Sequence, residues 1–161
     1  MASVTSAGGA RRRRRSITDI KESLRELRNE LSVLNRHVGA HVDLKDIDMD
    51  CLDLINTHGP MSPSALARRA GLHPATVTGV LDRLERGGWI VRERDSADRR
   101  AVGVHALRER NATLYGLFAG MNTAMNEICA DYDDAELELL ADFLRRATNA
   151  GRAATEQLAS E

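Results

Sequence analysis

The sequence is poor in cysteine and contains no long apolar run, and each absence excludes a class of protein. Its two cysteines, Cys51 and Cys129, lie far apart and fit neither a metal-binding spacing nor a disulfide framework, so reduced thiols are expected. A run of about 18 apolar residues is absent, which predicts no membrane span. Ser-His-Asp, metal-ligand and phosphate-loop patterns are absent as well. We therefore expect a protein that is not an enzyme and that holds no metal and no cofactor.

The N-terminal segment is rich in arginine. Residues 11–15 are five consecutive arginines, and polar residues rather than an apolar segment follow them. This pattern differs from a secretory signal and favours a cytoplasmic protein. Residues 1–16 contain almost nothing apolar to bury, which predicts a disordered arm.

Residues 17–42 carry the pattern of a long amphipathic helix. Apolar residues recur at alternating spacings of three and four, with charged residues on the outer face. The seam consists of Ile17, Ile20, Leu24, Leu27, Leu31, Leu34 and Val38. Such a helix buries its seam against a helical partner. Two further helical patterns follow within residues 108–150, and the second includes Leu137, Leu140, Leu144 and Ala147.

The charges are unevenly distributed along the chain. Residues 60–110 hold ten arginines and six acidic residues, whereas residues 111–161 hold three arginines and nine acidic residues. The net charge of −1 hides this segregation. A basic centre indicates an anionic partner for that segment alone.

Residues 46–107 predict a helix-turn-helix followed by a β-hairpin. A first helix stops at Gly59, which is suited to a left-handed cap. Ser62 is the N-cap of a short helix that ends near Gly71, and the next helix occupies residues 74–86. Short β-type runs then flank a polar loop.

Helical periodicity predicts which face of residues 74–86 is exposed. Val77 marks the centre of the buried arc, with Val80, Leu81 and Leu84 beside it. The outward positions are Ala75, Gly79, Asp82 and Arg86, flanked by Thr76, Thr78 and Arg83. Hydroxyl groups and an alanine methyl at the start of a helix suit the major groove of DNA, although an ordinary surface helix has the same apolar pattern.

The loop of the hairpin is crowded with cations, namely Arg92, Arg94, Arg99 and Arg100. Guanidinium groups on a hairpin tip suit a minor groove or a row of phosphates. Asp98 is expected to orient a neighbouring arginine through an ion pair. A charged turn alone indicates only solvation, but a helix-turn-helix before it favours DNA binding.

Three runs in this segment, SALARRAGL (64–72), ATVTGVLDRLERGG (75–88) and RDSADRR (94–100), resemble the MarR family of bacterial transcriptional regulators. The resemblance implies a mainly α fold: a winged helix-turn-helix with a small β-hairpin wing and N- and C-terminal dimerisation helices. It also implies a homodimer in which each lobe binds half of a pseudo-palindromic operator in double-stranded DNA.

This interpretation divides the chain into a disordered arm (1–16), an N-terminal dimerisation helix (17–42), a DNA-binding lobe (46–107), C-terminal dimerisation helices (108–150) and a flexible tail (151–161). The implied dimerisation residues are Ile17, Ile20, Leu24, Leu27, Leu31, Leu137, Leu140 and Leu144. The expected DNA-binding residues are Ser62, Ser64, Pro74, Ala75, Thr76, Thr78, Gly79, Arg83, Arg86, Arg94, Asp98, Arg99 and Arg100. The arm either follows DNA phosphates or is a solvated tail.

Two positions depart from the family pattern. Gly79 stands where an arginine or another long side chain is usual, and it either permits close approach of the backbone to DNA or weakens base recognition. Leu107-Arg108 replaces the usual Leu-Thr, so the following helix lacks a capping hydroxyl. Loss of this cap is expected to loosen the join between the lobe and the C-terminal helices by about 0.5–2 kcal/mol.

Three residues are weak candidates for binding an effector. His37 and His41 lie four residues apart, a spacing compatible with a shared metal, but nothing in the sequence completes a ligand set. Surface or pocket-lining histidines are the simpler interpretation. Cys51 lies among apolar residues without a cation beside it, so an inert core thiol is favoured over a redox sensor.

The sequence thus favours a ligand-responsive repressor of MarR type that binds its operator as a homodimer and responds to a small, phenolic-type effector. The alternative is an architectural protein that binds DNA without sequence specificity, which the arginine run and Gly79 support.

Overall fold

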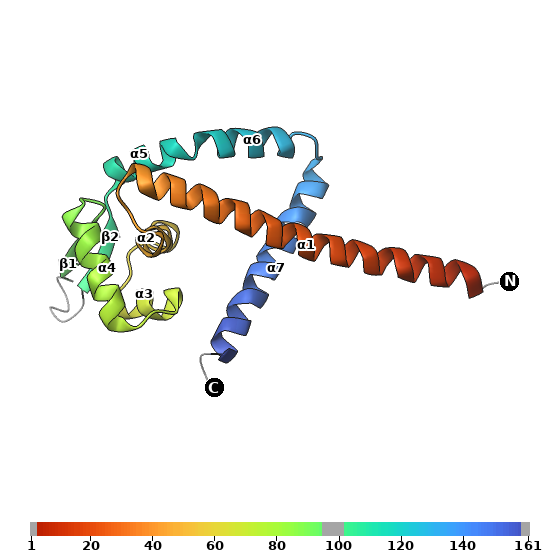
Figure 1. Cartoon of the computed structure of the whole chain (residues 1–161), viewed down its shortest axis with the longest axis horizontal. Helices are drawn as coiled ribbons and strands as arrows, with labels where there is room; N and C mark the ends of the chain where they lie inside the picture. Colours follow the sequence, from red (N-terminus) through yellow and green to blue (C-terminus); the bar gives the residue numbers. More distant parts are fainter. Residues whose placement is uncertain (1–2, 95–101, 159–161) are drawn as a thin grey trace. The chain divides into compact units, whose positions relative to one another are not determined.

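The computed structural model describes residues 3–94 and 102–158 (Figure 1). Its elements are α1 (Ser3–His41), α2 (Asp46–His58), α3 (Pro63–Ala70), α4 (Pro74–Arg86), β1 (Ile90–Arg94), β2 (Val102–Ala106), α5 (Arg108–Leu117), α6 (Ala119–Cys129) and α7 (Asp134–Leu158). The expected mainly α fold with a two-stranded wing is confirmed. The chain divides into two compact units between Met49 and Asp50.

The first unit contains the long helix α1, which corrects the prediction of a disordered arm over residues 1–16. From Ser3 onward these residues are helical, and the five arginines are exposed on the helix surface. Alanine and arginine are strong helix formers, and the segment contains no proline, so the helix that begins before the arginines continues through the apolar seam. The arginine run therefore has a regular backbone.

The apolar seam of α1 is solvent-exposed in the single chain. Ile17, Ile20, Leu27 and Leu31 are each between 37% and 43% exposed, and Leu24 is half-buried. Exposed aliphatic side chains at helical spacing form a face that a second helix would cover.

The core of the second unit joins α2, α3, α4 and the hairpin. Its fully buried side chains are Leu52, Ile55, Leu66, Val77, Val80, Leu81, Leu84, Ile90 and Val104. The buried arc predicted for α4 is thus confirmed. Since each of these elements contributes large aliphatic side chains, the core sets the position of α4 against the sheet.

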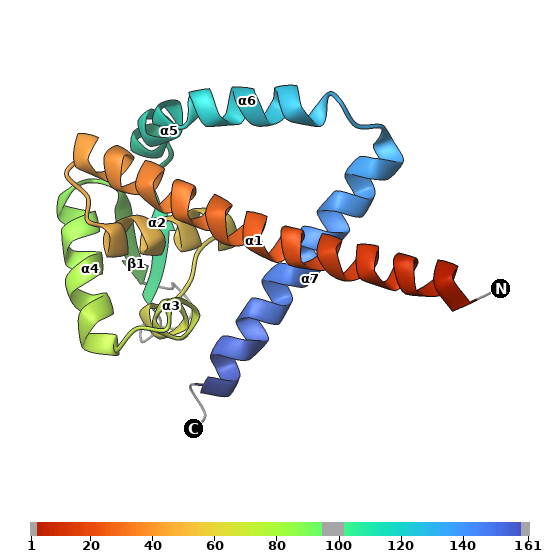
Figure 2. The ribbon, with the colours of Figure 1, turned by 45° about the vertical axis from the view of Figure 1, so that its right-hand side comes forward.

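The hairpin pairs β1 and β2 antiparallel, with Ile90 opposite Ala106 and Arg94 opposite Val102. Met61, just before α3, extends the sheet through a bridge to Val104. α4 contacts β1 and α3 contacts β2, so the hairpin lies beside the helix-turn-helix (Figures 1 and 2).

The C-terminal helices expose most of their apolar residues. In α7 no side chain is buried; Leu140 and Leu144 are 41% and 50% exposed, and Leu137 is half-buried. α7 continues to Leu158, which corrects the prediction of a flexible tail over 151–161, because this alanine-rich end contains good helix formers and no proline. None of the described helices combines the length and the apolar character that crossing a membrane requires.

Candidate nucleic-acid interface

The helix-turn-helix begins with a capped helix, as the sequence predicted. The Ser62 hydroxyl accepts a hydrogen bond from the backbone N–H of Ala65 (3.2 Å) and lies 3.0 Å from the Ser64 hydroxyl. Gly71 ends α3 in the left-handed conformation, with a φ of 65°. The two caps set the short length of α3, and the turn leads directly into α4.

The start of α4 is capped by a residue whose role sequence reasoning missed. Nδ1 of His73 accepts a hydrogen bond from the backbone N–H of Ala75 (3.2 Å), and Pro74 occupies the first turn. An accepting Nδ1 in a neutral ring carries its proton on Nε2. His73 therefore places an N–H donor at the exposed N-terminal end of the helix.

The outward face of α4 matches the predicted face. Ala75, Thr76, Thr78 and Arg86 are exposed. The Thr78 hydroxyl donates to the carbonyl of Pro74 (3.1 Å), so it meets an incoming group as an acceptor. This face presents small and hydroxyl-bearing side chains at one end and a cation at the other.

Gly79 leaves the centre of this face without a side chain. A Cβ built at this position would meet only Nη1 of Arg83, at 3.6 Å, and its φ is not in the left-handed region. The fold therefore does not require glycine here. The guanidinium of Arg83 lies beside the space that a side chain at position 79 would enter.

Arg92 belongs to the lobe rather than to the loop where the sequence placed it. It lies in β1, and its guanidinium forms ion pairs with Asp82 and Glu85 of α4, the latter at 3.3 Å from Nε to Oε2. Its backbone N–H also donates to Oε1 of Glu85 (3.2 Å). Charge attraction from two carboxylates holds Arg92 away from the tip and fixes β1 against α4.

The remaining wing residues are largely beyond what the structure describes. The backbone of Arg94 is the last of β1, while Asp98, Arg99 and Arg100 lie outside the described residues. The proposed ion pair of Asp98 therefore stays a prediction.

The three effector candidates do not gather in one site. His37 and His41 are exposed on α1, where Nδ1 of His41 donates to the carbonyl of His37 (2.8 Å). No group of three potential metal ligands occurs among the described residues. Cys51 is fully buried in the second unit, the environment that the core-thiol interpretation requires.

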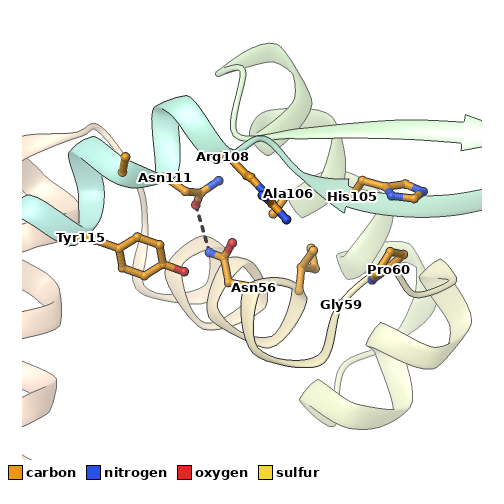
Figure 3. A pocket seen from close by; sticks show the side chains of 10 residues that line it. Asn56, Gly59, Pro60, His105, Ala106, Arg108, Asn111 and Tyr115 are labelled. Carbon is orange, nitrogen blue, oxygen red and sulfur yellow. Dashed lines mark hydrogen bonds between the residues drawn. The ribbon is translucent and has the colours of Figure 1, made fainter.

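A cavity of about 460 Å³ lies instead between α2, β2 and α5 (Figure 3). It is lined by Ile55, Asn56, Gly59, Pro60, His105, Ala106, Arg108, Asn111, Ala112 and Tyr115. The lining combines aliphatic walls with one arginine, two amides and a phenol. These residues come from three separate parts of the chain, so no local spacing announced them.

Asn111 ties this cavity to the base of the wing. Its side-chain N–H₂ donates to the carbonyls of Leu107 (2.7 Å) and Trp89 (3.2 Å), and its oxygen accepts from the amide of Asn56 (2.9 Å). As expected, no side chain caps α5 at Leu107. The predicted loosening of this join is corrected, because the buried amide of Asn111 ties the start of α5 to the residue before β1.

Aromatic side chains stand at both ends of this network. The guanidinium of Arg110 lies 4.7 Å from the ring centroid of Trp89, within cation–π range. Partial burial raises the pKa of Tyr115, and the negative charge of Asp53 raises this pKa further. The Tyr115 hydroxyl is therefore a neutral donor at physiological pH.

Comparisons with known proteins agree with this geometry. A sequence profile described as the MarR family matches residues 48–102. An uncharacterised HTH-type transcriptional regulator of Bacillus subtilis, YcgE, is 33% identical over 102 residues, which cover 63% of this chain and 66% of the relative. The HTH-type transcriptional repressor YetL of the same organism is 30% identical over 84 residues, or 52% of this chain and 50% of the relative.

Among solved structures, NadR in complex with 4-hydroxyphenylacetate matches with a TM-score of 0.61 and 23% identity, covering 80% of this chain and 91% of that one. At this identity the match concerns the fold. The matched profile covers α3, α4 and β1, the elements that build the exposed helix face and its brace, and together these findings show that the chain belongs to the MarR family.

Proposed function

We propose that the protein is a DNA-binding transcriptional regulator that represses by occupying a pseudo-palindromic operator as a homodimer. The observation that carries the proposal is the exposed face of α4: capped by His73, lined by Ala75, Thr76 and Thr78, and held to β1 by Arg92. A rigid helix with small and hydroxyl side chains at its N-terminal end fits a major groove and contacts base edges and phosphates.

The proposed DNA contacts follow the geometry of a winged helix. Ser62 and Ser64 place hydroxyls at the start of α3, while Pro74, Gly79, Arg83 and Arg86 complete the face of α4. Arg94, Asp98, Arg99 and Arg100 form the proposed wing contact to a phosphate row or minor groove. The arginine run of α1 adds sequence-independent attraction to phosphates.

Dimer formation is supported by the exposed apolar faces of α1 and α7. Ile17, Ile20, Leu27 and Leu31 on α1, and Leu140 and Leu144 on α7, expose between 37% and 50% of their surface. Covering aliphatic surface contributes about 25 cal/mol per Å² removed from water, so such helices gain from a second copy. Two lobes in one dimer would then meet two half-sites about one helical turn apart.

Repression and ligand response have separate supports. The printed name of the relative YetL is that of a repressor, and a dimer on an operator blocks polymerase sterically. NadR was solved with 4-hydroxyphenylacetate, and the present chain has a cavity of about 460 Å³ between α2, β2 and α5, within the size range of small-molecule sites. A cytoplasmic location accords with this function.

Binding-site selection with the full-length protein, followed by footprinting, tests the proposal. One or a few short protected palindromes are expected, with a mobility-shift stoichiometry of two chains per site. Uniform protection of unrelated fragments would instead identify an architectural DNA-binding protein, the function that the arginine run and the bare Gly79 position favour.

A Thr76→Ala variant sharpens this test. Removing the exposed hydroxyl is expected to weaken binding to the selected site while leaving binding to random DNA unchanged, since only specific binding uses base edges. The matched control is Thr148→Ala on α7, whose hydroxyl donates to the carbonyl of Leu144 and lies outside the helix-turn-helix. Equal loss in both variants would contradict a role for α4 in recognition.

A further inference from the structure

We propose that the cavity between α2, β2 and α5 binds a small aryl or alkyl monocarboxylate, and that its occupancy changes operator affinity through Asn111. This inference rests on the proposed function, because it assigns the regulation of that function to a site and a ligand class.

The chemistry of the lining selects the ligand. Ile55, Pro60, Ala106 and Ala112 provide apolar surface for a ring or a short chain. Arg108 provides a planar cation that bonds a carboxylate in bidentate geometry, and it forms no ion pair with the other described residues.

The surrounding charges restrict the ligand to one negative group. Figure 3 shows Arg108 between His105 and Tyr115, with Asn56 and Asn111 beside it. His105 lies 3.8 Å from the carboxylate of Glu93, and Tyr115 is within electrostatic reach of Asp53. A second carboxylate on the ligand would meet one of these acidic groups, whereas a neutral polar group would find the amides and the phenol.

Asn111 connects occupancy to the wing. Three hydrogen bonds from this one side chain reach Asn56 in α2, Leu107 at the start of α5, and Trp89 just before β1. A ligand that bonds the Asn56 or Asn111 amide competes with these bonds. Because Trp89 lies between the end of α4 and β1, the competition acts where the recognition helix and the wing meet.

Trp89 also makes binding measurable, since it is the single tryptophan of the chain and it is buried beside Asn111. The full-length protein is titrated with benzoate, with benzyl alcohol as the neutral probe and phthalate as the dianionic probe, and Trp89 fluorescence is recorded. Saturable change with benzoate, and much weaker change with the other two, is the expected result.

Two variants locate the binding. Arg108→Gln removes the exposed cation and is expected to weaken benzoate roughly tenfold or more, because a hydrogen bond to a charged group is lost. Ala112→Leu keeps every charge but fills the cavity, and is expected to weaken benzoate as well. Arg68→Gln, an exposed arginine of α3, is the charge-matched control and should bind benzoate like the original protein.

Operator binding is measured in parallel, with and without benzoate. A benzoate-dependent change in operator affinity that Arg108→Gln and Ala112→Leu both suppress supports the proposal. Benzoate binding that ignores both variants overturns the site, and site-specific binding without any effect on the operator overturns the regulation. Failure to bind any operator in the absence of benzoate would instead overturn the proposed function, whatever the cavity binds.

Discussion

The guanidinium of Arg92 on β1 forms an ion pair with the carboxylate of Asp82 on α4, so a single cation joins the recognition helix to the wing. Glu85, one turn further along α4, accepts from both the side chain and the backbone of Arg92. Two acidic residues on the helix therefore act internally, and the cations of the lobe are not all available to DNA.

This brace predicts a binding defect that exceeds its stability effect. Asp82→Ala, Arg92→Ala and the double variant are expected to show a coupling of about 0.5–1 kcal/mol in the free energy of unfolding, as for other partly exposed pairs. Operator affinity should fall clearly in each single variant, because the hairpin loses its fixed orientation. Denaturation and mobility-shift titrations measure the two effects.

The matched control for the brace is the ion pair between Asp142 and Arg145 on α7, with an N···O distance of 2.9 Å. Breaking it with Asp142→Ala or Arg145→Ala should leave operator affinity unchanged. If Arg92→Ala binds the operator as tightly as the original protein, the brace has no role in recognition.

The bare position at Gly79 predicts opposite uses of two substitutions. Gly79→Ala should raise the free energy of unfolding by about 0.5–1 kcal/mol, since the position is helical and a Cβ meets only an ordinary contact at 3.6 Å. Gly79→Arg adds a cation to the face presented to DNA and should steepen the salt dependence of operator binding by about one. Loss of stability in Gly79→Ala would contradict the open geometry.

The buried amide of Asn111 predicts a stability cost. Asn111→Ala leaves the carbonyls of Trp89 and Leu107 with fewer partners and should lower the free energy of unfolding by about 1–3 kcal/mol. Asn122→Ala, an exposed asparagine on α6, is the control and should change stability by less than about 0.5 kcal/mol. Equal effects would show that the network at the start of α5 contributes nothing.

The wing tip predicts a change in salt dependence. Arg100→Ala should weaken operator binding and reduce the slope of log affinity against log salt by about one, the effect of one lost phosphate contact. A titration over several salt concentrations measures this slope, with Arg152→Ala on α7 as the control. Unchanged affinity across the titration would count against a role of the wing tip in DNA binding.

Sequence reasoning succeeded where the determinants are local. Ser62 and Gly71 bound α3 as predicted, because caps depend on neighbours within a few residues. The buried arc around Val77 followed from helical periodicity alone. Residues 3–16 were mispredicted because the low apolar content was weighed above the helix propensity of alanine and arginine.

Reasoning from the sequence failed where partners are distant along the chain. Arg92 was assigned to the loop because its neighbours are charged, yet its carboxylate partners lie seven and ten residues earlier, on α4. Asn111 and Asn56 are separated by 55 positions, so neither the join at α5 nor the cavity beside it had a local signature.

The sequence by itself determined the order of the elements, the caps of α3, the outward face of α4 and the resemblance to a family, since periodicity and capping act within one or two turns. Only the tertiary structure decided which charges act internally, how α5 is joined to the wing, and where a cavity forms. These features depend on side chains that packing brings together, and a distance in space is not encoded by a spacing in sequence.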